Sequence, residues 1–228
     1  MNFNELKLRE IIKETSDTYS FIFEPSEGLT WGAGQHAMFK LKDANLPEGE
    51  KDFRIFSIAS SMEDGFIMAT TRIEEKCSAY KKELLKMNVG DFILMANPLG
   101  NFNIHPEYKK SFIMAGGIGI TPIRSILRHL QKDNVNKEIT VLYSDDRGEF
   151  AYEDTFKDII ADMANLDFHF VSDRNEFTDK IEAYAKENQN EAEYLIAGSP
   201  GMNNFISGKL EALGIEKSNI KMDNFMGY

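Results

Sequence analysis

The pattern of apolar and polar residues divides the chain into two parts. Up to about residue 105, short alternating apolar runs are separated by turns, which is typical of antiparallel strands. The clearest runs are YSFIFEP (19–25), QHAMFKLK (35–42), FRIFSIAS (53–60) and GFIMATTRI (65–73). One helical segment (78–87) interrupts them, and VGDFILMANPLGNF (89–102) returns to strand and turn. The first part is therefore expected to form a small antiparallel β-barrel.

After residue 110 the rhythm changes to buried apolar strands that alternate with amphipathic segments of helix length. The expected strands are SFIMAG (111–116), EITVLYS (138–144), LDFHFVS (166–172), AEYLIAG (192–198) and NIKMDN (219–224), and helices are expected near 120–132, 152–163, 177–188 and 201–213. Strand-helix alternation predicts a parallel sheet with both faces covered. The predicted fold is a barrel domain (1–107) followed by a five-stranded parallel α/β domain (108–228).

Composition narrows the class of protein. The 228 residues are 42% hydrophobic and 28% charged, as in ordinary globular proteins. A net charge of −11 argues against broad nucleic-acid binding, which depends on neutralising phosphates. The single cysteine, Cys77, excludes an iron-sulfur cluster held by this chain alone. No apolar run is long enough to span a membrane, and the charged N-terminal stretch does not match a signal peptide, so a cytoplasmic location is expected.

The segment AGGIGITP (115–122) lies where the first strand of the second part gives way to a helix. Gly116, Gly117 and Gly119 would let a ligand approach the backbone, and the start of the helix favours an anion such as a pyrophosphate. Pro122 suits the first turn of a helix, and Thr121 could cap the helix or bond a phosphate oxygen. A tight turn that binds nothing remains the alternative.

A second turn, in AGSPGM (197–202), follows the fourth strand of the second part. Ligands of open α/β sheets bind outside the carboxyl ends of the strands, so this turn should lie at the same edge as the first one. The residues concerned are Gly198, Ser199, Pro200 and Met202. Taken alone, the turn also reads as an ordinary helix start.

The first part supplies a possible second nucleotide site. In RIFS (54–57), strand alternation puts Arg54 and Phe56 on one face and Ile55 and Ser57 on the other. About twenty residues later, Ser78 is positioned to cap a helix and offer its NH groups to an anion. An arginine, an aromatic ring and a capped helix are the parts needed to hold a flavin nucleotide.

Several motifs in the same order resemble the ferredoxin-NADP reductase family, in a single-chain form without an iron-sulfur domain. The segments that carry the resemblance are WGAGQHAMFKL (31–41), RIFS, KCSAY (76–80), VGDFILMANPLGNF, GGIGITP and AGSPGM. The resemblance covers essentially the whole chain. It implies an FAD-binding barrel, with FMN a weaker alternative, and a nicotinamide-nucleotide domain.

The resemblance also implies roles for individual residues. Arg54, with Cys77 and Ser78, would hold the flavin diphosphate, Phe56 would pack on the isoalloxazine, and Ser57 would bond near flavin N5 as a catalytic residue. Further flavin contacts are expected from Ile55, Ala69, Thr70, Thr71 and Arg72. The nicotinamide dinucleotide would meet Gly116, Gly117, Gly119, Thr121, Pro122, Ser144, Arg147, Tyr152, Gly198, Ser199, Pro200 and Met202.

The sequence departs from the family pattern at two positions near the expected reactive centre. Phe56 stands where a tyrosine is usual, and Ala197 stands where many members carry a cysteine. At the other end of the chain, Tyr228 coincides with the C-terminal tyrosine that covers the flavin in plant-type members, and it is the second expected catalytic residue. Phe225 competes with it for that role.

The segment YSDDRGEFAY (143–152) contains some residues that favour NADPH and others that favour NADH. Ser144, Arg147 and Tyr152 resemble a 2′-phosphate site and favour NADPH. Asp145 and Asp146 would repel that phosphate and could bond ribose hydroxyls, which favours NADH. The balance is expected to fall slightly on NADPH. The four histidines lack ligand spacing, so no metal site is expected.

These features predict an NAD(P)H-dependent flavoprotein reductase that passes electrons to a separate acceptor: ferredoxin, flavodoxin, an oxygenase component or a small molecule. The alternative is a non-catalytic flavin- or nucleotide-binding subunit, either regulatory or electron-channelling, which the substitutions Phe56 and Ala197 motivate.

Overall fold

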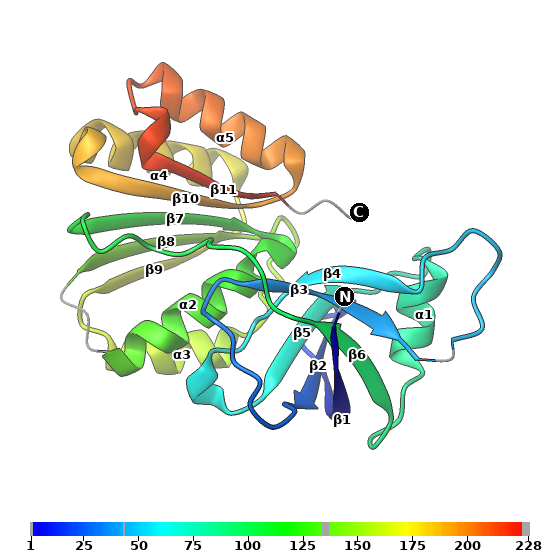
Figure 1. Cartoon of the computed structure of the whole chain (residues 1–228). Helices are drawn as coiled ribbons and strands as arrows, with labels where there is room; N and C mark the ends of the chain where they lie inside the picture. Colours follow the sequence, from blue (N-terminus) through cyan, green and yellow to red (C-terminus); the bar gives the residue numbers. More distant parts are fainter. Residues whose placement is uncertain (1, 43, 134–136, 225–228) are drawn as a thin grey trace.

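The computed structural model describes residues 2–42, 44–133 and 137–224, which form two domains, each built on one β-sheet (Figure 1). Six strands of the N-terminal domain are antiparallel, in the order β4-β3-β6-β1-β2-β5. They are β1 (Phe3–Lys13), β2 (Thr18–Glu24), β3 (His36–Leu41), β4 (Phe53–Ser57), β5 (Ile67–Arg72) and β6 (Phe92–Ala96). A bridge between Ile58 and Ala69 joins the two ends of this order and nearly closes a barrel.

Alternation of side chains explains the barrel. In β3, Ala37, Phe39 and Leu41 are buried while the residues between them are partly exposed. In β1, Leu6 and Leu8 point inward from a strand that is otherwise rich in charged residues. The helix α1 (Ala79–Leu85) follows β5, and Tyr80 and Leu84 on its inner side join the barrel core.

The second sheet is parallel throughout, in the order β11-β10-β7-β8-β9. Its strands are β7 (Lys110–Gly116), β8 (Glu138–Ser144), β9 (Leu166–Val171), β10 (Ala192–Gly198) and β11 (Ile220–Asn224). The fold class expected from the sequence is therefore confirmed. Because β10 lies on one side of β7 and β8 on the other, the strand order reverses at β7, which is the position where open α/β sheets bind ligands.

Four helices cover the two faces of this sheet (Figure 1). They are α2 (Ile120–Asp133), α3 (Glu153–Asp162), α4 (Arg174–Asn188) and α5 (Pro200–Ala212). Apolar side chains of α2 and α3 pack on one face, and those of α4 and α5 pack on the other. Among the described residues, no helix combines the length and the apolar character needed to cross a membrane.

A buried ion pair holds the segment that connects β6 to β7, and so the two domains, in place. The domain boundary expected at 107/108 falls in this segment. Lys137 Nζ lies 2.6 Å from Glu193 Oε1, and both side chains are almost fully buried. The hydroxyl of Ser111 and the backbone NH of His105 also donate to Glu193, and Lys137 donates to the carbonyl of His105. This cluster ties the connection to the base of the parallel sheet.

Replacing Glu193 by glutamine should lower the free energy of unfolding by about 3 kcal/mol, because it leaves the Lys137 ammonium buried without its counter-charge. Urea unfolding measures the difference. Glu153→Gln is the matched control, since Glu153 pairs with the exposed Lys157, and it should have a far smaller effect. Equal effects of the two substitutions would contradict the assigned role of Glu193.

Candidate functional site at the domain interface

Helix α2 holds the barrel against the carboxyl edge of the parallel sheet. Arg124 donates to the carbonyl of Ala59 at 2.8 Å and to Asp64 at 3.0 Å, and Arg128 also pairs with Asp64. Burial alone would raise the pKa of Asp64, but the charge of Arg124 and the hydrogen bonds from Ser61 NH and Arg128 lower it overall. The ionised carboxylate thus joins the barrel to α2.

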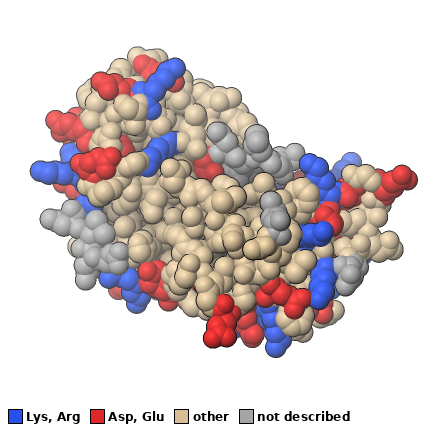
Figure 2. Space-filling view, viewed as in Figure 1, with Lys and Arg blue, Asp and Glu red and all other residues tan. Residues whose placement is uncertain are grey.

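A groove of about 1010 Å³ runs along the barrel beside β4 and the start of α1. This volume lies at the upper end of the range for small-molecule sites, as a dinucleotide cofactor requires. The charged residues that line it are mostly basic: Lys51, Arg54, Arg72, Lys76, Lys81 and Lys82, against Glu50, Glu74 and Glu75. Figure 2 shows lysine and arginine side chains, with acidic ones between them, on the side of the molecule that carries α1.

The groove therefore carries excess positive charge in a protein that is acidic as a whole. Burial is the main cause that lowers the pKa of the Lys81 ammonium; the charges of Arg54 and Arg72 act in the same direction, while Cys77 and Glu74 act in the opposite one. A bound diphosphate would neutralise part of the positive charge that lines the groove, so the groove fits an anionic cofactor of this size.

Five of the expected flavin residues line this groove together: Arg54, Ile55, Arg72, Cys77 and Ser78. Arg54 lies over the ring of Tyr80, 5.0 Å from its centroid, and forms an ion pair with Glu50. Ser78 caps α1 by accepting a hydrogen bond from Lys81 NH, as expected. The side chains of Ala69, Thr70 and Thr71 are buried.

Phe56 differs from the expectation that its ring packs on a flavin. It is half-buried, and its ring packs against Phe39 and Tyr80, with centroids 5.7 and 6.1 Å apart. Its neighbour Ile55 is the exposed residue, at 55%. Alternation along β4 turns Phe56 toward the barrel core, so an apolar contact with a ligand in the groove is available from Ile55.

Ser57 meets a partner from the other domain that the sequence did not reveal. Its hydroxyl donates to Asp223 Oδ2 at 3.4 Å, across 166 positions of the chain. Asp223 lies in β11, in register with Ala197 of β10. Burial raises the pKa of Asp223, while the charge of His36 and the bond from Ser57 lower it in part. A partly buried carboxyl group whose pKa is raised, placed between two domains, is a candidate functional group.

The glycines at the sheet edge have packing reasons of their own. A Cβ atom on Gly119 would lie 2.0 Å from the carbonyl oxygen of Ala197, and one on Gly116 would lie 2.2 Å from the sulfur of Met202. Gly117 has φ +52, which disfavours other residues. Met202 also covers Gly198, so the two turns are packed against each other. The structure thus brings the two predicted turns together at one edge.

Other residues of these two turns cap or begin the helices α2 and α5. The hydroxyl of Thr121 donates to the carbonyl of Ile118, and Pro122 lies in the first turn of α2. Ser199 caps α5 by accepting from Met202 NH, and Pro200 is the first residue of that helix. No group of three or more His, Cys, Asp or Glu in the described ranges could hold a metal ion.

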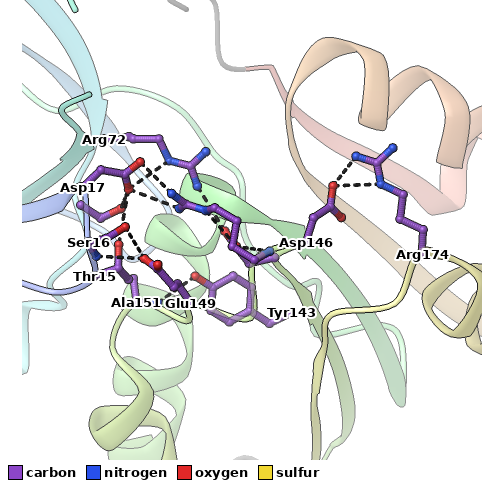
Figure 3. A network of polar contacts seen from close by, with 12 residues as sticks. Thr15, Ser16, Asp17, Arg72, Tyr143, Asp146, Glu149, Ala151 and Arg174 are labelled. Atoms are coloured by element: carbon purple, nitrogen blue, oxygen red, sulfur yellow. Dashed lines mark hydrogen bonds and ion pairs between the residues drawn. The ribbon is translucent and has the colours of Figure 1, made fainter. Parts of the chain in front are cut away.

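The three residues expected at a 2′-phosphate site, Ser144, Arg147 and Tyr152, do not share one surface. Arg147 pairs with Asp17 of the barrel domain and with Asp145, in the network of Figure 3. Tyr152 is only 4% exposed and lies beneath Arg124, whose guanidinium is 5.4 Å from the ring centroid. The structure therefore removes Tyr152 from the surface on which we expected it to meet a nucleotide. Ser144 is half-buried at the end of β8. Phe225 and Tyr228 lie outside the described residues.

Comparisons with known proteins agree with this arrangement. Residues 113–208 match the family model described as "Oxidoreductase NAD-binding domain". The plasma membrane-associated coenzyme Q6 reductase of Saccharomyces cerevisiae is 26% identical, over 92% of this chain and 70% of its own length. The NADH-cytochrome b5 reductase 1 of Dictyostelium discoideum is 26% identical, over 95% of this chain and 79% of its own length. Other relatives are longer: this chain spans 50% of a Na(+)-translocating NADH-quinone reductase component of Actinobacillus pleuropneumoniae.

A solved structure gives a likeness of fold over nearly the whole chain. The ferredoxin-NADP+ reductase of Plasmodium falciparum superposes with a TM-score of 0.80 and 18% identity, over 98% of this chain and 97% of that one. The two-domain fold, the matched domain and the relatives are those of NAD(P)H-dependent flavoprotein reductases. Residues 113–208 thus match an oxidoreductase NAD-binding domain, and over nearly its whole length the chain is similar in sequence to coenzyme Q6 and cytochrome b5 reductases and in fold to a ferredoxin-NADP+ reductase.

Asp223→Asn should raise the free energy of unfolding at neutral pH, because it removes a buried charge. The ordinary pKa is 3.8 and the folded pKa lies above it, so ionisation of Asp223 opposes folding as the pH rises through the folded value. The gain should shrink toward zero as the pH falls toward 3.8.

Urea unfolding from about pH 4 to about pH 8 measures this gain. Asp154→Asn, at a side chain that is 98% exposed, is the control and should show little pH dependence. A gain for Asp223→Asn that grows as the pH falls would show that the assigned direction of the pKa shift is wrong.

Proposed function

We propose that this protein is an NAD(P)H-dependent flavoprotein reductase that binds FAD in the barrel groove and delivers electrons to a separate acceptor. The observation that carries the proposal is the meeting of Ser57 from the barrel with Asp223 from the parallel sheet, beside the edge where both nucleotide turns end. A reaction between a nucleotide bound to the barrel and one bound to the parallel sheet needs a place where residues of both domains meet.

The residues present fit FAD in the groove. Arg54 would give up its pair with Glu50 and place its planar guanidinium against the diphosphate, whose geometry it matches better than a lysine does. Lys81, whose ammonium is partly buried beside other cations, would add a second positive charge. Cys77 and Ser78 line the same stretch of the groove, and Ile55 offers an exposed apolar side chain to the cofactor.

When bound, the flavin accepts a hydride from the reduced nicotinamide and releases electrons singly or in pairs. The hydroxyl of Ser57 would orient the reactive part of the ring. Asp223 accepts a hydrogen bond from that hydroxyl, and burial raises the pKa of its carboxyl group. The glycine turn at Gly116 and the cap at Ser199 would position the nicotinamide dinucleotide.

Within this sequence the single cysteine cannot ligate an iron-sulfur cluster, and we propose that the electrons pass to a separate acceptor. Ferredoxin, flavodoxin, an oxygenase component and a small molecule all suit a flavin donor. The name of the yeast relative, coenzyme Q6 reductase, favours testing a quinone among the small molecules. We propose a cytoplasmic location.

The proposal is tested by anaerobic absorbance spectroscopy. The purified protein should be yellow, with bound flavin, and should bleach when NADH or NADPH is added. A colourless protein that FAD cannot reconstitute would overturn it. Bound flavin that stays oxidised with both nucleotides would favour the alternative, a non-catalytic flavin-binding subunit, which Phe56 and Ala197 motivate. Bleaching that requires a partner protein would favour an electron-channelling subunit.

Arg54→Ala should weaken FAD binding by roughly tenfold to a hundredfold, the loss expected for a charge-assisted hydrogen bond to phosphate. Titration of the apoprotein with FAD, followed by flavin fluorescence, measures the dissociation constant. Glu50→Gln is the matched control: it removes the present partner of Arg54 but keeps the guanidinium. It should bind FAD as tightly as the wild type or more tightly, and equal weakening by both substitutions would refute the role of Arg54.

A further inference from the structure

Arg147, the residue best suited to bind a 2′-phosphate, is held by a carboxylate of the other domain. Its Nη1 lies 2.8 Å from Asp17 Oδ2 and its Nη2 lies 3.2 Å from Asp17 Oδ1, so the guanidinium is bound at two points. Asp17 lies in the turn between β1 and β2 of the barrel. Burial alone would raise the pKa of Asp17, but the hydrogen bond from Arg147 and the charges of Arg72 and Arg147 lower it overall.

Asp145, in the second domain, also binds Arg147 and thereby helps to hold its guanidinium. Its side chain is 5% exposed, and its two oxygens face Arg72 at 3.1 Å and Arg147 at 3.4 Å. The backbone NH of Arg147 also donates to it, at 3.0 Å. The two arginines and the two aspartates alternate, so the charge of Arg147 is already neutralised within the network.

A contact next to the Asp17–Arg147 pair, between Ser16 and Glu149, also holds the segment after β8 against the barrel. Glu149 accepts hydrogen bonds from the NH and the hydroxyl of Ser16, at 2.9 and 2.5 Å, and Figure 3 shows Ser16 and Asp17 facing the segment that carries Glu149. The segment after β8 is thereby held on the barrel by adjacent residues of one turn. For Arg147 to reach a ligand at the sheet edge, its bonds to Asp17 must break.

Two further side chains beyond β8, Asp146 and Tyr152, do not favour a phosphate. Asp146 is half-exposed and pairs with Arg174, at the start of α4, and Figure 3 shows this pair apart from the network around Asp17. Tyr152 is buried. A 2′-phosphate placed beside the end of β8 would meet the carboxylate of Asp146, whereas an unmodified ribose could donate its hydroxyl to that carboxylate.

We propose that the chain selects NADH over NADPH, and that Asp17 of the barrel sets this selectivity by withholding Arg147 from the 2′-phosphate. The inference rests on the proposed reductase function and reverses the slight preference for NADPH expected from the sequence. Asp17 acts here as a specificity-determining residue that does not touch the nucleotide.

Stopped-flow reduction of the bound flavin by NADH and by NADPH tests the inference on the intact protein. The wild type should use NADH at least roughly tenfold more efficiently, because a 2′-phosphate would lack its cation. Asp17→Asn should lower the NADH/NADPH ratio of kcat/KM by roughly tenfold, mainly through a lower KM for NADPH. Asp17→Asn/Arg147→Ala should lose this gain, since no guanidinium is left to release.

Ser16→Ala is the matched control, because it removes the hydroxyl hydrogen bond to Glu149, keeps the backbone one and leaves the Asp17–Arg147 pair in place. It should keep the wild-type ratio. Flavin content, measured by absorbance, checks that each variant is folded and loaded. If Asp17→Asn fails this check, Asp146→Ser tests the same preference, and it should also improve use of NADPH.

The outcomes separate the inference from the function on which it rests. Reduction by neither nucleotide overturns the reductase proposal and the inference with it. Reduction by NADPH as fast as by NADH leaves the reductase proposal standing and overturns the inference. An Asp17→Asn variant that is folded and loaded with flavin but keeps the wild-type ratio overturns the role of Asp17.

Discussion

Asp17 joins the two domains through a single carboxylate, which faces Arg72 at 3.5 Å and Arg147 at 2.8 Å. Both partners also contact the buried Asp145, so opening the interface would separate Arg147 from Asp17 and Arg72 from Asp145. Buried charges are costly to separate from their counter-ions. Together with the ion pair between Arg124 of α2 and Asp64 of the barrel, the network fixes the carboxyl edge of the parallel sheet against the barrel.

That fixed geometry allows residues of one domain to complete a site in the other. Ser57 ends β4 of the barrel, and Asp223 lies in the last strand of the parallel sheet, yet they are within hydrogen-bond reach. Neither domain alone would hold both groups. The same interface determines which side chains are left for the nucleotide, because an arginine used to hold the domains together is not free to bind a phosphate.

The sequence predicted the architecture well because its signals are local. Alternation indicated the barrel strands, apolar runs such as EITVLYS indicated the parallel strands, and Ser78 was recognised as a helix cap from its position. The segment that became β1 was not named among the clear runs, because it is rich in charged residues and, of its side chains, Leu6 and Leu8 alone are fully buried.

Contacts between distant segments could not be predicted in this way. Asp223 was missed because nothing near it in the sequence indicates Ser57. Arg147 and Tyr152 were expected to bind the nucleotide because their segment resembles a 2′-phosphate site, but the pairing of Arg147 with Asp17 and the burial of Tyr152 depend on how the domains pack. The glycines of the first turn were correctly placed at the sheet edge, but the closeness of Ala197 and Met202 emerged only from the fold.

The central claim is that one flavin spans the barrel groove and reaches the contact between the domains. A crystal structure of the protein with FAD tests it most directly. We expect the diphosphate between Arg54 and Ser78, and the isoalloxazine within hydrogen-bond distance of Ser57 on the side of Asp223. A flavin bound elsewhere, or one whose ring lies away from Ser57 and Asp223, would contradict this claim.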